Sequence, residues 1–354
     1  MEIGSIFSIS KLEESGTISS PLDESAVHFS LCREALFVIA RHFEGSQRRV
    51  LLPAYTCQTV IDPFLQLGWK IRYYNITNQL RIDTENLLYE CERFSPSVCV
   101  AHPYYGADLN ERELQALSVV KSKGCALIED LTQCIFSTQR DTVFDFFIGS
   151  YRKWFPIPDG AFLMSKGSVA ELVMDEMLEN RAFVHSMSDA MYLRGVFLQT
   201  GDENVKEISR RVGNVAIGHI SGIIHPHRMS DFSIGLLSRI DIDKAKRRRM
   251  DNYRYLYEHL SINDDCLPVD RKLNEITCPP LFFPIYVKDR AVFQKKLAHQ
   301  EIYAPVLWPV QTSTVMINDN IKRIYNEILM LPVDQRYGLC DMERMLGVIE
   351  SKDK

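Results

Sequence analysis

The first 165 residues alternate between short apolar segments and amphipathic segments, and this alternation restricts the fold more than any other feature of the sequence. Segments with helical spacing of apolar residues occupy 32–43, 59–68 and 111–124. Strand-like apolar segments occupy 48–55, 70–76, 97–106, 125–130, 144–150 and 160–166. A strand–helix–strand repetition of this kind predicts an α/β fold with a mainly parallel sheet that is covered by helices on both faces.

The ends of these strands are the expected position of a ligand. In open parallel sheets, ligands bind beyond the carboxyl ends of the strands. The candidate chemistry therefore lies after Ala54, after Ala101, at Asp130 and at residues 150–153.

The second half of the chain has a different pattern. Residues 234–260 predict one long helix, and its basic stretch is interpreted as a solvated helix face. A proline-rich strand at 277–287, a helix at 289–300 and a terminal helix at 339–351 follow, which is typical of a smaller α+β domain.

Two domains are predicted from this change of pattern. A large α/β domain spans residues 15–235 and a small C-terminal α+β domain spans 236–354, with residues 1–14 packing on the small domain. Within the large domain, the connection 167–225 is long and helical, so we expect it to remodel the entrance for the substrate.

Composition excludes several classes of protein. The net charge of −5 argues against a nucleic-acid-binding protein, and no apolar run approaches the ~20 residues that span a bilayer. The first residues do not have the pattern of a signal peptide, so a cytoplasmic location is expected. The nine cysteines include no C-x-x-C pair, and His225 and His227 alone do not make a metal site, so no bound metal is predicted.

A lysine and an aspartate carry the candidate chemistry. Asp130 ends an apolar strand and is followed by Gln133, and Lys153 lies 23 residues further on among aromatic side chains. An apolar setting favours a nucleophilic amine. These two residues are the minimum set for pyridoxal phosphate (PLP) chemistry, in which a lysine forms an imine and a carboxylate keeps the ring nitrogen protonated.

The sequence resembles the DegT/DnrJ/EryC1/StrS family of PLP-dependent sugar aminotransferases, of fold type I. The resemblance covers nearly the whole chain and rests on motifs in the family's order. These are LLPAYTCQTV (51–60), KIRYYNIT…LRID (70–83), VAHPYYGADLN (100–110), LIEDLTQC (127–134), FDFFIGSYRKWFPIPDGAFLMSK (144–166), the Arg-Met-Ser-Asp helix with its continuation (226–260) and EILMLPVDQRY (327–337).

The resemblance implies a role for each matching residue. Lys153 would form the Schiff base and carry the proton, Asp130 would pair with the pyridinium nitrogen, and Gln133 would lie near the phenolic oxygen. Ser150 would contact the phosphate. The remaining candidates are Leu31 and Cys32 for the phosphate, Cys57 and Tyr55 for the cofactor ring, and His102, Tyr105 and Arg228 for the substrate.

The sequence departs from the family pattern at several of these positions. Ser150 and Lys153 are three residues apart, where the family has five. Cys57 stands where the family often has an aromatic residue that stacks on the ring, and Pro226 replaces an asparagine that reaches the phosphate of the partner subunit.

The activity implied by the resemblance is transfer of an amino group from glutamate to the keto group of a nucleotide-linked sugar, for cell-surface polysaccharide or secondary-metabolite synthesis. The active site of such enzymes is built at a homodimer interface. Two alternatives stay open: a PLP-dependent lyase or dehydratase on the same fold, and a non-catalytic relative with a binding role. Dehydratase relatives replace the lysine with histidine, so Lys153 favours transamination, and retention of Asp130 and Gln133 argues against a non-catalytic relative.

Overall fold

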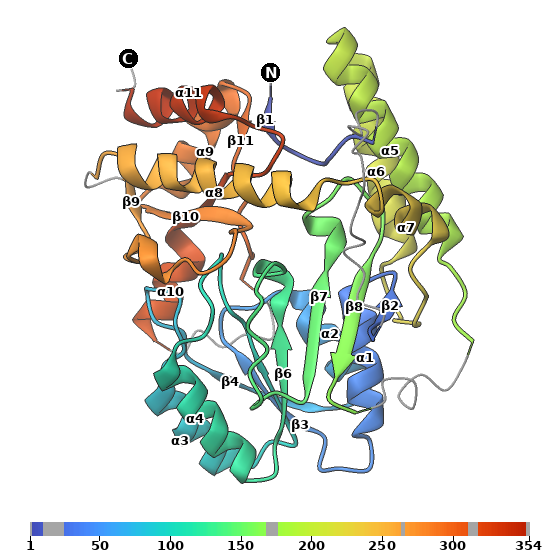
Figure 1. The fold of residues 1–354 in the computed structure, drawn as a ribbon, viewed down its shortest axis with the longest axis vertical. Coiled ribbons are helices and arrows are strands. Elements are labelled where there is room, and N and C mark those ends of the chain that lie inside the picture. The colour runs from blue at the N-terminus through green and yellow to red at the C-terminus, as the bar shows by residue number, and fades with distance from the viewer. Residues whose placement is uncertain (1, 10–24, 168–175, 263–265, 311–317, 352–354) are drawn as a thin grey trace.

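A seven-stranded sheet forms the centre of the protein (Figure 1). The computed structural model describes residues 2–9, 25–167, 176–262, 266–310 and 318–351. The strands of the sheet are β2 (Val27–Phe29), β3 (Arg49–Pro53), β4 (Lys70–Tyr74), β5 (Val98–Ala101), β6 (Ala126–Asp130), β7 (Phe146–Ser150) and β8 (Ala161–Ser165). Their spatial order is β2-β8-β7-β6-β5-β3-β4. The five strands from β4 to β7 in this order are parallel, whereas β8 is antiparallel to both β7 and β2. The predicted α/β class with a mainly parallel sheet is confirmed.

Helices cover both faces of this sheet, which explains why its central strands are apolar throughout. The four helices are α1 (Cys32–His42), α2 (Gln58–Gln66), α3 (Thr84–Phe94) and α4 (Glu111–Ser122). Helices α1 and α2 pack together, and α3 and α4 pack together on the opposite face, as right-handed crossovers require. All residues of β5 and β7 are buried as a result.

Helix α3 was not predicted from the sequence. Its apolar residues Leu87, Cys91 and Phe94 have helical spacing, and the Asp83 side chain caps its N-terminus by accepting a hydrogen bond from the Asn86 amide. Both signals are present in the sequence, but no element is assigned to residues 84–96 in the sequence analysis.

A second, smaller sheet lies beyond the carboxyl ends of the large one. It has the antiparallel order β12-β10-β9, formed by β12 (Ile328–Pro332), β10 (Phe282–Val287) and β9 (Cys266–Pro268). The helices of this part of the chain are α8 (Ile242–His259), α9 (Arg290–His299), α10 (Asp319–Glu327) and α11 (Leu339–Glu350). A separate hydrophobic core fills this region.

The N-terminal segment lies against this C-terminal region. Strand β1 (Ile3–Gly4) pairs in parallel with β11 (Ile302–Tyr303), and the Tyr337 hydroxyl lies 2.7 Å from the Gly4 amide nitrogen. Residues 10–24 lie outside the described residues, so the domain boundary at residue 15 stays a prediction.

The single long helix expected over residues 234–260 is wrong. The structure has two helices, α7 (Asp231–Leu237) and α8, with a break between them. The reason is a capping residue inside the predicted run: Asp241 accepts a hydrogen bond from the Lys244 amide and starts α8.

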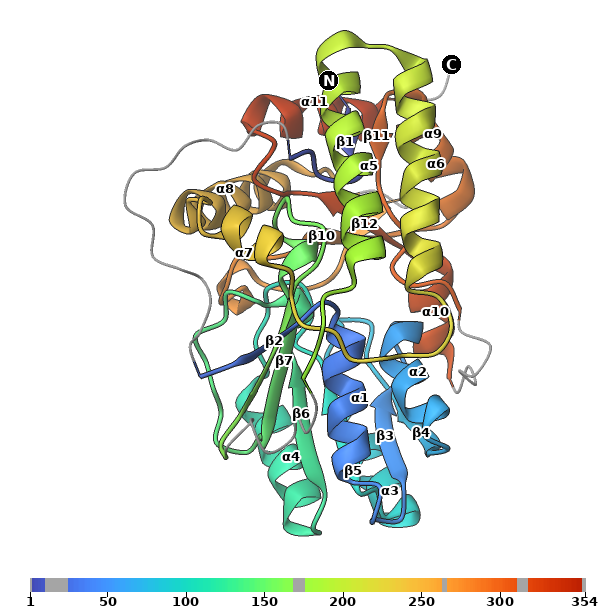
Figure 2. The same cartoon turned by 90° about the vertical axis from the view of Figure 1, so that its right-hand side faces the viewer.

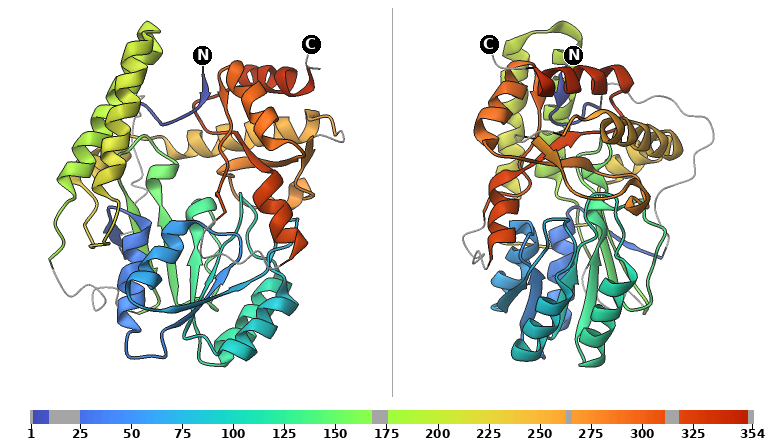
Figure 3. Two further views of the ribbon diagram at one scale, coloured as in Figure 1. Left: turned by 180° about the vertical axis from the view of Figure 1, so that it is seen from behind. Right: turned by 90° about the vertical axis from the view of Figure 1, so that its left-hand side faces the viewer.

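A helical hairpin projects along one side of the molecule (Figures 2 and 3). It consists of α5 (Arg181–Thr200) and α6 (Glu203–His219), which pack along each other. Phe183 and Met187 of α5 pack with Leu31, the residue that precedes α1. The hairpin therefore contacts the end of α1 that faces the carboxyl ends of the strands. Within the described ranges, no helix is long and apolar enough to cross a membrane.

Candidate functional site

Asp130 is the last residue of β6, and its carboxylate is buried at the carboxyl end of the sheet. One oxygen, Oδ1, accepts a hydrogen bond from the Thr132 amide at 2.9 Å. The other, Oδ2, lies 3.4 Å from Nδ1 of His102, the residue that follows β5. On the far side of that ring, Nε2 lies 2.8 Å from Oγ1 of Thr56. The turn after β6 and the end of the neighbouring strand β5 thus fix the orientation of the carboxylate from two directions.

The environment of the His102 ring favours its neutral form. Burial lowers the pKa of His102 below its ordinary value, although the nearby Asp130 carboxylate opposes the change. A neutral imidazole that donates from Nδ1 toward Asp130 can accept from Thr56 at Nε2. His102 therefore contacts Asp130 through Nδ1 and Thr56 through Nε2, so both nitrogens of the His102 ring face protein atoms.

Lys153 reaches the same place from the next strand. Strand β7 pairs with β6 and is followed directly by a 3₁₀ turn, η2 (Tyr151–Lys153), while Asp130 is followed by another, η1 (Leu131–Gln133). The buried indole of Trp154 donates a 2.8 Å hydrogen bond to the Thr132 carbonyl and so holds the two turns together. The Trp154 carbonyl in turn accepts from Gln335 at 2.7 Å, which attaches the lysine turn to the C-terminal region.

One cavity brings most of the predicted residues together. It is lined by Leu31, Cys32, Arg33, Leu36, Cys57, Thr59, Val60, His102, Asp130, Thr132, Gln133, Ser150, Arg152, Lys153 and Trp308. Eight of the predicted residues are in this set: Lys153, Asp130, Gln133, Ser150, Leu31, Cys32, Cys57 and His102.

Three predicted residues lie outside this lining. Tyr55 and Tyr105 are fully buried, with their hydroxyl oxygens 3.3 Å apart, and Tyr55 packs on Trp308 at a ring distance of 5.0 Å. Tyr55 follows a buried strand and lies in an aromatic cluster. It therefore contacts the cavity only indirectly, by packing against the lining residue Trp308. Arg228 is part-exposed and paired with Asp231 and Glu179, so its guanidinium is engaged away from Lys153.

The sequence reading missed several lining residues. Arg152 adjoins Lys153, and Arg33 lies in the first turn of α1, so a search for cations near the candidate phosphate site could have found both. Trp308 had no such signal, because it comes from the C-terminal region and reaches the cavity only through the tertiary fold.

The N-terminus of α1 forms one side of the cavity. Leu31 occupies the cap position and offers no side-chain hydrogen bond to the amides of the first turn. A phosphate group would suit this side of the cavity. It could accept hydrogen bonds from the amides of the first turn, from the guanidinium groups of Arg33 and Arg152 and from the Ser150 hydroxyl.

The residues present fit PLP. At the other side of the cavity, the Gln133 side chain is buried, and its Oε1 has no hydrogen-bond partner among the described residues. A buried amide oxygen without a partner indicates a missing polar group. Asp130 could pair with a ring nitrogen, Lys153 could bind a carbonyl carbon, and the α1 terminus could hold the phosphate.

A larger groove opens from Lys153 toward the C-terminal region and the hairpin. Its basic lining residues are Arg152, Lys153, Arg194, Lys206, Arg210, Arg249, Lys295 and Arg336. Arg194 and Lys206 pair with Glu2, and Arg336 pairs with Asp334, the acidic residue in the lining. The groove therefore carries a net positive charge beside the cavity.

Comparison with known proteins identifies the fold. No family model matches the sequence, and no curated protein matches it significantly. Among solved structures, the sugar aminotransferase CalS13 from Micromonospora echinospora is similar over 93% of this chain and 88% of its own, with a TM-score of 0.66 and 16% identity. NtdA from Bacillus subtilis, solved with the cofactor PMP, has a TM-score of 0.62 and 18% identity over 92% of this chain and 73% of its own.

A third structure carries the family's name. The DegT/DnrJ/EryC1/StrS aminotransferase from Brucella abortus has a TM-score of 0.61 and 15% identity, over 92% of this chain and 84% of its own. The chain has the fold of the DegT/DnrJ/EryC1/StrS sugar aminotransferases.

Proposed function

We propose that this protein is a PLP-dependent aminotransferase that moves an amino group from glutamate to the keto group of a nucleotide-linked sugar. One observation carries the proposal: Lys153, Asp130 and Gln133 line a single cavity at the carboxyl ends of β6 and β7. The cofactor bound in NtdA and the sugar aminotransferase activity in the name of CalS13 support it.

Each residue has a distinct task in this proposal. When bound, PLP supplies an electron-withdrawing ring that stabilises negative charge on the carbon that loses a proton. Asp130 holds the ring nitrogen in its protonated form, because its carboxylate is buried and held by Thr132 and His102. Lys153 would hold the cofactor through its Nζ, and its amine would be the group that carries a proton between carbon atoms during transfer.

The basic groove supports an anionic acceptor. Arg210 and Lys295 line it without an ion pair among the described residues, which leaves two cations available for a ligand. A diphosphate that joins a sugar to a nucleoside has the charge to suit this surface. Arg152 lines both the groove and the cavity. In the proposal it lies between the cofactor phosphate and the diphosphate of the acceptor.

The hairpin supports the homodimer that the resemblance implies. Helices α5 and α6 expose large apolar side chains: Tyr192, Leu198, Ile208, Val215 and Ile217. An exposed apolar surface of this kind is typical of an interface. Light scattering should give twice the chain mass, and a monomer that still turns over would contradict this part of the proposal.

The deciding experiment is a spectrum of the purified protein saturated with PLP, followed by addition of glutamate. Binding through Lys153 gives a visible absorbance band, and amino transfer from glutamate removes that band with formation of one oxoglutarate per site. A protein that binds no PLP would support the non-catalytic alternative. A protein that binds PLP but eliminates water from a sugar substrate, with no oxoglutarate from glutamate, would support the lyase or dehydratase alternative.

A further inference from the structure

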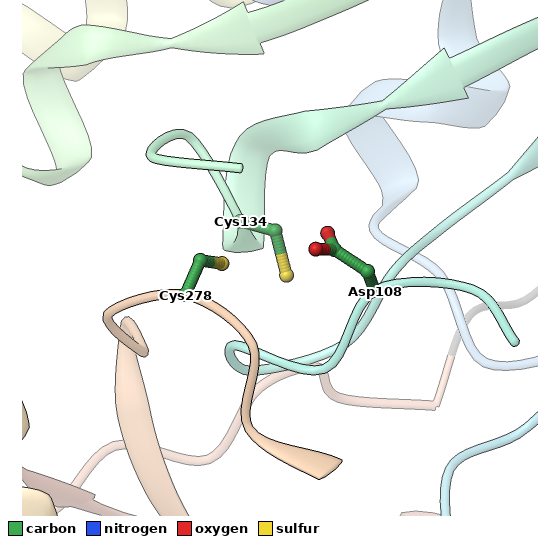
Figure 4. Close-up of side chains that lie close together, drawn as sticks. All are labelled: Asp108, Cys134 and Cys278. Carbon is green, nitrogen blue, oxygen red and sulfur yellow. The ribbon is translucent and has the colours of Figure 1, made fainter. Parts of the chain in front are cut away.

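Three potential metal ligands from distant parts of the sequence lie together next to the candidate site (Figure 4). A carboxylate oxygen of Asp108 and the sulfur atoms of Cys134 and Cys278 all lie within 4.8 Å of one another. Both cysteines are buried and Asp108 is half-buried. The sequence predicted no metal site because no two cysteines have the spacing of a metal-binding motif.

The backbone builds this cluster independently of any ligand. Asp108 lies in the loop after β5, Cys134 directly follows Gln133, and Cys278 lies in the segment before β10. The amides of Thr277 and Cys278 both donate to the Gly106 carbonyl, at 2.9 and 3.1 Å. Gly106 has φ +85°, and a Cβ there would lie 2.6 Å from the Cys278 carbonyl oxygen, so only glycine permits this approach.

The polar groups of the cluster are incompletely satisfied by the protein. Oδ2 of Asp108 accepts a 2.8 Å hydrogen bond from the Thr277 hydroxyl, but Oδ1 is buried without a partner among the described residues. In Figure 4 the carboxylate is turned toward the Cys134 sulfur. The Gly106 amide donates to this sulfur at 3.2 Å, and the Cys134 thiol donates to the Pro103 carbonyl at 3.4 Å. A buried carboxylate oxygen without a donor requires an explanation, and a cation beside the sulfurs provides one.

We propose that Asp108, Cys134 and Cys278 bind one divalent metal ion, and that zinc is the ion that fits. Two thiolates and a carboxylate are a ligand set that zinc accepts in a tetrahedral site. Zinc–sulfur bonds of about 2.3 Å in that geometry put the two sulfurs about 3.8 Å apart. The two sulfurs now lie within 4.8 Å of each other, so they need to approach by at most about 1 Å. Water or the second carboxylate oxygen completes the coordination, and the thiol protons leave to solvent on binding.

The position of the ion gives it a structural role. It would join the turn that carries Gln133 into the cavity to the segment that leads into the small sheet. Binding to the folded chain alone raises its stability in proportion to the logarithm of the metal concentration over Kd. The proposed metal site uses none of the residues assigned to the reaction, so it does not rest on the proposed aminotransferase activity.

Metal analysis of the full-length, tag-free protein tests the proposal. The PLP-saturated protein is reduced, treated with a chelator, supplied with zinc or cobalt(II) and separated from free metal by gel filtration. We expect one metal per chain, and for cobalt(II) a thiolate-to-metal charge-transfer band. Cys134→Ser, Cys278→Ser and Asp108→Asn should each lose the bound metal. Cys125→Ser, at a buried cysteine outside the cluster, is the matched control and should keep it.

Two results would overturn the proposal. The first is a wild-type protein that is reduced and folded but retains no metal. It would overturn the proposal even if Cys134 and Cys278 then form a disulfide on exposure to oxygen. The second is equal metal loss in Cys125→Ser and in the cluster variants. Circular dichroism of each variant verifies the fold, and Asp108→Asn, at a half-buried position, keeps the test usable if a cysteine variant unfolds.

Discussion

The Asp130 carboxylate lies 3.4 Å from the buried His102 ring, and this pair joins the ends of two neighbouring strands at the candidate site. The histidine is held from behind by Thr56, at 2.8 Å. Burial lowers the pKa of His102, which favours the neutral imidazole beside Asp130.

His102 is expected to act as a positioning residue for Asp130. In His102→Leu, the carboxylate loses a neighbour, which costs about 1–3 kcal/mol for a buried group. The rate of the glutamate half-reaction should then fall roughly tenfold to hundredfold. In His102→Asn a side-chain N–H is retained, so a substantial part of the rate should return, as measured by stopped-flow absorbance. Equal rates in the Leu and Asn variants would show that the ring acts only through packing.

Asp130→Ala should have a larger effect on the same step. An unpaired buried cation costs about 3–5 kcal/mol, which corresponds to a fall of roughly two to four decades in rate at ~1.36 kcal/mol per tenfold. Asp251→Ala, an exposed position on α8, is the control. A loss below tenfold in Asp130→Ala would refute the proposed role of the carboxylate.

Lys153→Ala should abolish both the visible absorbance of the cofactor and the release of oxoglutarate. The reason is that no other side chain in the cavity lining carries a primary amine. Lys166→Ala, at an exposed lysine after β8, should behave like the wild type. A band of full intensity that resists dialysis in Lys153→Ala would exclude this lysine as the attachment site.

Glu129 should make the protein less stable as pH rises. This side chain is buried, and burial raises its pKa to about 8, so the folded state holds a proton that the unfolded chain releases near its ordinary pKa of 4.5. Between these two values the folded state binds more protons, and the free energy of unfolding falls by roughly 1.4 kcal/mol per pH unit. The stability of Glu129→Gln relative to the wild type should therefore increase from about pH 5 to 8.

Urea unfolding at several pH values in reducing buffer measures this difference. Glu343→Gln, at an exposed position of α11, should show a pH-independent difference from the wild type. A pH-independent difference for Glu129→Gln as well would mean that this carboxyl group is ionised in the folded protein.

The order of apolar segments along the chain predicts the alternation of the large sheet and the strand ends at which the candidate site lies. Apolar runs such as β5 and β6 predict buried parallel strands because helices cover both faces, and that pattern is local. Asp130, Gln133 and Lys153 could be selected for the same reason, since Asp130 ends such a run and the other two each lie three residues after one. Even so, the break between α7 and α8 was missed, because one aspartate cap interrupts an otherwise helical pattern.

The side chains that surround these residues depend on the tertiary fold. Trp308 reaches the cavity from a segment 155 residues beyond Lys153, and Tyr55 turns into an aromatic cluster although it stands two residues before Cys57, which lines the cavity. The cysteine pair beside Asp108 likewise depends on a loop crossing at Gly106. Contacts of this kind depend on how distant segments cross and pack, and no local period or spacing in the sequence encodes that geometry.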